Sequence, residues 1–154
     1  MSWRVLAACA AAGALLCACG STVSAATAVK NWASTNSFGQ GAQDMITDSS
    51  NVHAEIVKHR STKTIFTYCS YLFADGEGEN TDLLPTPDAQ LTTLLSTALD
   101  GFIHAASICD SAPSDPAVQR QVLADDQRAI GTLTSAVLRE EAITGTSLGV
   151  QGIP

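Results

Sequence analysis

Aromatic and basic residues are both scarce in this sequence. Phe, Trp and Tyr make up 5% of the 154 residues, and 8 Lys and Arg stand against 15 Asp and Glu. The formal net charge of −7 at pH 7 argues against binding to nucleic acid, and against attraction to anionic lipid head groups by charge alone. We therefore expect no nucleic-acid partner.

Sequence signatures of catalysis are also missing. The chain has no Gly-x-Ser-x-Gly elbow and no glycine-rich phosphate loop, and its three histidines do not form a zinc motif. The run from Asp75 to Asp82 alternates acids as calcium loops do. An EF-hand needs Gly at position six and Glu at position twelve, but these positions hold Asn80 and Thr86. We expect no enzymatic activity, no cofactor and no metal.

The N-terminus carries a short apolar run. Residues 5–18 are almost wholly Ala, Leu, Val, Gly and Cys. This run is shorter than the roughly 20 residues of a spanning helix, but it fits the apolar core of a secretory signal peptide, residues 1–18. The stretch from Leu16 to Cys19, LCAC, resembles a bacterial lipobox. That resemblance implies cleavage between Ala18 and Cys19; an ordinary signal-peptidase cut near Ala25 is the alternative.

The same resemblance implies lipidation of Cys19. A diacylglyceryl group supplies two acyl chains, about the number that stable membrane anchoring requires. The expected location is therefore the extracytoplasmic face of the cell membrane, with the lipid on Cys19 as the membrane contact. The chain from Cys19 onward keeps seven basic and all fifteen acidic residues, a formal charge of −8.

Two cysteines remain after the leader and the anchor are set aside. They are Cys69 and Cys109. An even pair in an exported domain predicts one disulfide, because export places the domain in an oxidising compartment. Two buried free thiols are the alternative.

Small polar residues fill the segment after the expected anchor. Residues 19–36 contain many Ser, Thr and Ala and one Trp, which predicts a flexible tether. As an alternative, Val23, Ala26, Val29 and Ala33 form one weak helical face that would let Trp32 dock on the domain.

Helical periodicity begins at Phe38 and predicts an antiparallel four-helix bundle over residues 37–145, an all-α fold. Asp115-Pro116 and Thr86-Pro87 are typical helix starts, and Gly145 is a typical helix end. The tail, residues 146–154, has no pattern and is expected to be loose. The expected helices span residues 38–60, 63–75, 87–109 and 116–143.

The predicted disulfide restricts how the second helix continues. Cys69 lies in the expected second helix, whereas Cys109 lies at the far end of the third. Disulfide bonding needs Cα atoms within about 7 Å. We therefore predict that residues 76–86 form an ordered or semi-extended acidic loop that continues along the bundle after a short second helix.

One carboxylate falls close to the apolar face of the fourth expected helix. Asp126 lies near the middle of that face. A buried carboxylate needs a partner, for which His53 or Arg60 on the first helix would serve. We favour the simpler interpretation that Asp126 lies at the edge of the face.

The lipobox, the Ser/Thr/Ala tether and the two remaining cysteines resemble those of small helical lipoproteins from actinobacteria and their temperate phages. The stretches NWAS and PTPDAQLTTLL are also similar. The resemblance implies a cell-envelope location. Our first hypothesis is a non-enzymatic interaction module with a protein partner in the envelope, one form of which is a phage-encoded lipoprotein that blocks superinfection. The alternative is a small-ligand or lipid carrier of the envelope.

Overall fold

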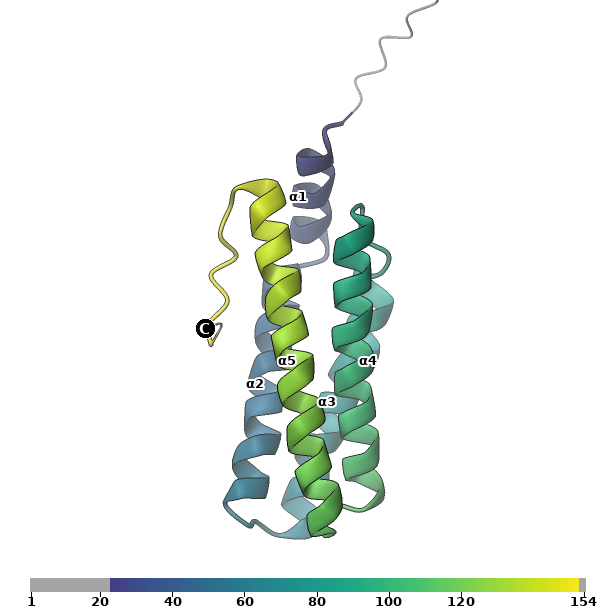
Figure 1. Cartoon of the computed structure of the whole chain (residues 1–154), viewed down its shortest axis with the longest axis vertical. Coiled ribbons are helices and arrows are strands. Elements are labelled where there is room, and N and C mark those ends of the chain that lie inside the picture. Colours follow the sequence, from purple (N-terminus) through teal and green to yellow (C-terminus); the bar gives the residue numbers. More distant parts are fainter. Residues whose placement is uncertain (1–22, 153–154) are drawn as a thin grey trace, which may run out of the picture.

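Five helices make up most of residues 23–152, the part of the chain that the computed structural model describes. Four long helices lie antiparallel in a bundle, and a short helix extends past one end of it (Figure 1). The predicted all-helical bundle is confirmed, with one additional helix. The helices are α1 (Ala25–Thr35), α2 (Phe38–Val57), α3 (Thr62–Leu83), α4 (Ala89–Ser111) and α5 (Pro116–Thr144).

Side-chain caps begin four of the five helices. The Ser61 hydroxyl accepts a hydrogen bond from the Thr64 amide, and Asp88 accepts one from Leu91. Such caps satisfy amide groups that have no partner inside a helix. Asp88 also receives two hydrogen bonds from Arg139, at 2.9 and 3.2 Å, which lower the pKa of the Asp88 carboxyl and connect the start of α4 to α5.

Helix α3 is much longer than the sequence indicated. We expected a helix over 63–75 and a loop over 76–86, but α3 continues unbroken to Leu83. The acidic run is therefore helical. Buried Gly76 and Leu83 explain the continuation, because both pack into the bundle. The helix ends at Leu83, and the next residue, Leu84, has the extended backbone that the following proline favours.

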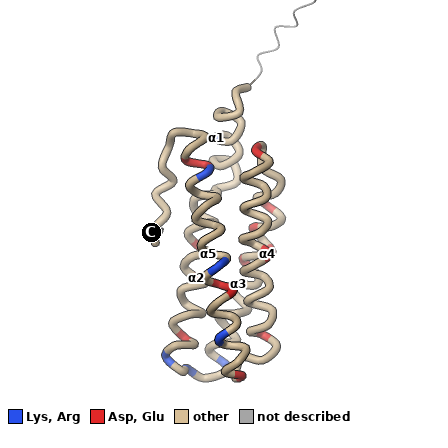
Figure 2. Tube along the Cα trace, viewed as in Figure 1, with Lys and Arg blue, Asp and Glu red and all other residues tan. Residues whose placement is uncertain are grey.

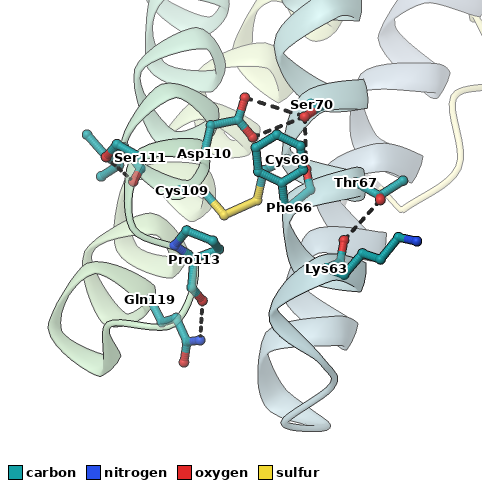
Figure 3. The surroundings of a disulfide bond; sticks show 11 residues. Lys63, Phe66, Thr67, Cys69, Ser70, Cys109, Asp110, Ser111, Pro113 and Gln119 are labelled. Carbon is teal, nitrogen blue, oxygen red and sulfur yellow. Dashed lines mark hydrogen bonds between the residues drawn. A yellow bond between two sulfur atoms is a disulfide. The ribbon is translucent and has the colours of Figure 1, made fainter.

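A disulfide joins α3 to α4, as predicted. Cys69 and Cys109 are both buried, and their Cα atoms are 6.0 Å apart. Because α3 and α4 are antiparallel and similar in length, a residue near the start of α3 meets one near the end of α4. The neighbouring Ser70 hydroxyl donates to Asp110 at 3.2 Å and forms a second link between the helices (Figure 3).

Most of the predicted tether is helix α1, so the expectation of a flexible segment is wrong for residues 25–35. The alternative, a docked helical face, is confirmed for Val29 and Ala33, which are buried, but not for Val23, which is 62% exposed and precedes the helix. The Trp32 ring lies 5.2 Å from that of Phe38, between ring centroids, and its indole N–H donates to the Leu83 carbonyl at 3.1 Å. Residues 19–22 lie outside the described part of the chain.

Helix α4 is the central helix of the bundle. It contacts both α3 and α5 extensively, and eight of its residues are buried. Within residues 23–152 it is the one helix whose length and composition would allow it to cross a membrane, criteria that a buried core helix also meets. The buried α4 residues are Leu91, Leu95, Ala98, Leu99, Phe102, Ala105, Ala106 and Cys109.

The segment after α5 turns back along the bundle (Figure 1). Gly145 ends the helix in the left-handed conformation, as predicted. We expected a loose tail, but two backbone amides in it are held by side chains. The Leu148 amide donates to Glu141 at 2.7 Å, and the Gln151 amide donates to Gln43 at 2.7 Å.

Basic residues gather at the end of the bundle away from α1 (Figure 2). Lys58 and Arg60 lie in the turn between α2 and α3, Lys63 lies in the first turn of α3, and Arg120 lies in the first turns of α5. Four of the seven basic residues after the expected leader are therefore at one end. We refer to this end as the basic end.

Candidate functional site

The most distinctive polar site lies between α2 and α5, which pack against each other less extensively than the other neighbouring pairs of long helices. A pocket of about 320 Å³ opens there, and we call it the α2–α5 pocket. Its lining combines apolar side chains, two serines, an imidazole and a carboxylate. The lining residues are Ser49, Ser50, His53, Leu123, Asp126, Gln127 and Ile130.

Asp126 is buried, so our expectation that it lies at the edge of the apolar face is wrong. Its exposed fraction is 2%, and the fully buried Ser49 donates a hydrogen bond to Oδ2 at 2.5 Å. Of the two partners that the sequence suggested, His53 lines the same pocket. Arg60 instead pairs with Glu55 at 3.7 Å.

Burial raises the pKa of Asp126 to about 6. The Ser49 hydrogen bond and the charge of His53 oppose this increase, but they offset only part of the cost of removing the carboxylate from water. The second oxygen, Oδ1, is also buried, and no residue of the described chain donates a hydrogen bond to it. The bundle therefore contains a carboxyl group whose ionised form is poorly satisfied.

Replacing this carboxyl should change how stability depends on pH. A pKa raised from 3.8 to about 6 stabilises the fold below pH 4, and this contribution is lost as the pH rises through 6. We expect Asp126→Asn to gain stability relative to wild type by about 2 kcal/mol between pH 4 and pH 7. Urea unfolding at both pH values measures this difference.

Asp100→Asn is the matched control, because Asp100 is exposed on α4. Its effect should stay within about 0.5 kcal/mol at both pH values, as is usual for surface substitutions. An Asp126→Asn effect that is the same at pH 4 and pH 7 would contradict the assignment of a poorly satisfied buried carboxylate.

The pocket contains Ser, His and Asp but not in a catalytic arrangement. In a hydrolase triad the serine gives its proton to the imidazole, which the carboxylate orients. Here the Ser49 hydroxyl bonds directly to Asp126, and Ser49 is fully buried. His53 is exposed at the rim. This geometry is suited to binding a donor group rather than to activating a serine.

A second carboxylate, Asp125, faces the opposite side of α5, toward α4. Its Oδ1 accepts a hydrogen bond from Arg128 at 2.5 Å, and its Oδ2 lies 3.8 Å from His104 Nε2. His104 is 59% exposed. Asp125 and Asp126 are therefore adjacent in sequence, but Asp125 faces α4 and Asp126 faces α2.

Acidic residues cluster where α2 meets α3. Burial, followed by the neighbouring carboxyl of Asp75, raises the pKa of Asp48 to about 7. Burial and then the charges of Asp82, Asp44 and Asp75 raise the pKa of Glu79. Within residues 23–152, no three His, Cys, Asp or Glu side chains are placed to hold a metal ion. We assign this cluster no ligand.

Glu140 is a buried acid that the sequence analysis did not single out. Its exposed fraction is 2%, and its Oε2 has no hydrogen-bond partner among the described residues. Burial raises the pKa of this carboxyl, and the charge of Glu141 adds to the effect. It lies in the last turns of α5, and this end of α5 is beside α1 (Figure 1).

Of the predicted site residues, the disulfide pair is confirmed, and the two residues of the signal cleavage and lipidation site are not tested. The pairing of Cys69 with Cys109 is confirmed. The cleavage site at Ala18 and the lipidation site at Cys19 lie outside the described residues, so both stay predictions. Ser49 was missed, because an isolated serine on a helix has no sequence signal that distinguishes a buried donor from a solvated one.

Comparison with known proteins assigns no relative to this chain. No family model matches it, and neither a curated protein nor a solved structure does. Functional inference therefore depends on the residues and the geometry described above.

Proposed function

We propose that this protein is a membrane-anchored, non-enzymatic interaction module on the extracytoplasmic face of the cell membrane. The observation that carries the proposal is the disulfide between buried Cys69 and Cys109. Disulfides persist in oxidising compartments, and a chain with an apolar leader reaches such a compartment by export. The bridge and the leader, at separate places in the sequence, support the same location.

The position of Cys19 would hold the bundle close to the membrane at one end. Cys19 lies six positions before Ala25, the first residue of α1. Fully extended, six residues span at most about 20 Å. A lipid on Cys19 would therefore keep the α1 end near the membrane and direct the basic end away from it, where a partner can reach it.

The lipid anchor makes a direct prediction about location. We expect the wild-type protein in the membrane fraction and Cys19→Ala in the soluble extracytoplasmic fraction, because the variant has no thiol to carry the acyl chains. Fractionation and immunoblotting of whole cells measure this difference. Cys17→Ala is the control, since this residue leaves with the leader, and it should remain membrane-bound. Membrane retention of Cys19→Ala would contradict lipid anchoring.

The partner is sought by crosslinking in intact envelopes. Wild-type protein should capture a specific envelope protein that Cys19→Ala does not, because only the anchored chain is held at the membrane.

For the specific form in which the protein blocks superinfection, expression of the gene should reduce phage DNA entry into the cell. Unchanged phage adsorption and DNA entry would exclude a role in blocking superinfection, but would not contradict the proposal of a membrane-anchored interaction module.

A further inference from the structure

One buried carboxylate oxygen in the lining of the α2–α5 pocket has no hydrogen-bond donor. Asp126 Oδ2 accepts from Ser49, but Oδ1 has no donor within residues 23–152. Buried polar atoms are nearly always hydrogen-bonded, and a buried carboxylate oxygen without a donor is costly. Oδ1 itself has almost no accessible surface, so a molecule that enters the pocket can supply this donor only when the carboxyl turns toward it.

The charge of the pocket favours a cation. Neither Lys nor Arg lines it, and His53 at the rim is the one other titratable group in the lining. At neutral pH the ionised form of Asp126 predominates, because its pKa is about 6. A positively charged donor satisfies the oxygen and also compensates the buried charge.

The walls of the pocket favour an apolar body on that cation. Leu123 and Ile130 are partly buried hydrophobic side chains that line it. The Ser50 hydroxyl already donates to the Ile46 carbonyl at 2.7 Å. The volume of about 320 Å³ is at the small end of the roughly 300–1,000 Å³ of small-molecule sites.

We propose that the α2–α5 pocket binds a small organic cation, a primary ammonium group on a short apolar body. The ammonium donates to Asp126 Oδ1, and the apolar body packs against Leu123 and Ile130. This inference goes beyond the proposed function, because the pocket belongs to the bundle whether or not Cys19 is lipidated.

The experiment titrates 2-phenylethylammonium into the full-length protein in nonionic detergent micelles and follows amide signals by NMR. We expect saturable shifts in the millimolar range that centre on Ser49, Ser50 and Asp126. The neutral analogue 2-phenylethanol should bind at least tenfold more weakly, because a hydrogen bond to a charged group contributes roughly this factor or more.

Two variants locate the site. Asp126→Asn should weaken ammonium binding at least tenfold, and it is expected to fold because it removes only the charge. Asp125→Asn, the adjacent carboxylate on the other side of α5, should leave binding unchanged. Gln127→Trp alters only an exposed rim position and should block entry without changing the carboxyl.

Three results would overturn the proposal. They are no saturable binding of the ammonium, equal binding of the alcohol, and equal weakening by Asp125→Asn and Asp126→Asn. The first would indicate that water alone satisfies Oδ1. None of these results bears on membrane anchoring, which the Cys19 and Cys17 variants test separately.

Discussion

Removing the disulfide between Cys69 and Cys109 is expected to lower the free energy of unfolding by about 4 kcal/mol. The bridge joins residues 40 positions apart and therefore closes a long loop in the unfolded chain. In the chain-entropy account, a closed loop of this length stabilises the fold by about that amount. The loss would be a large fraction of the roughly 5–15 kcal/mol that stabilises a typical domain.

The measurement compares wild-type protein with the Cys69→Ala/Cys109→Ala double variant by urea and thermal unfolding. A loss of about 4 kcal/mol corresponds to a melting temperature lower by about 15 °C in a domain of this size. Reducing the wild-type protein provides the control, because it breaks the bond without truncating side chains. If the reduced protein unfolds at the wild-type urea midpoint, the bridge does not supply the expected stability.

The helix ends show what could be predicted from the sequence. Asp115 followed by Pro116, and Gly145 near the end of the chain, mark both ends of α5 by local chemistry alone. The apolar spacing likewise predicted a helix over residues 87–109, close to the observed α4, because each position of the pattern depends only on its neighbours one turn away. Local signals of this kind do not require knowledge of the rest of the fold.

Helix α3 was predicted less well, because its continuation depends on contacts with another helix. Gly76, Gly78 and Asn80 all have low helix propensity, which favours the loop that we expected. In the structure, a Cβ atom on Gly76 would lie 2.9 Å from Ile103 Cγ1 on α4. The glycine thus allows close packing of α3 on α4, and the packing outweighs its low propensity.

The candidate site was only partly predicted, for a related reason. The sequence left Asp126 open, because a carboxylate near the middle of an apolar face is either buried with a partner or displaced to the edge of that face. Its partner Ser49 is 77 residues away in the chain, so only the approach of α2 to α5 brings the two together. Whether Asp126 is buried depends on the position of the neighbouring helix, and the periodicity of a single helix contains no information about that position.

The docking of α1 rests on a buried aromatic residue, and its removal should have the second large effect. Phe38 is fully buried at the start of α2, next to Trp32 of α1. Truncating a buried Phe to Ala typically costs 3–5 kcal/mol, because apolar contacts are lost and a cavity is left. We expect Phe38→Ala to destabilise the protein by about this amount and to loosen α1 from the bundle.

The measurement uses a chain from residue 20 onward, in which Trp32 is the only tryptophan. Urea unfolding should show the loss of stability, and the emission of Trp32 should shift to the red in native buffer, since its ring loses the Phe38 contact. Phe66→Ala is the matched control, because Phe66 is 45% exposed and its truncation should cost less than about 1 kcal/mol. Equal costs for the two variants, with unchanged Trp32 emission, would indicate that α1 is not packed on the bundle and that the segment before α2 acts as a flexible tether.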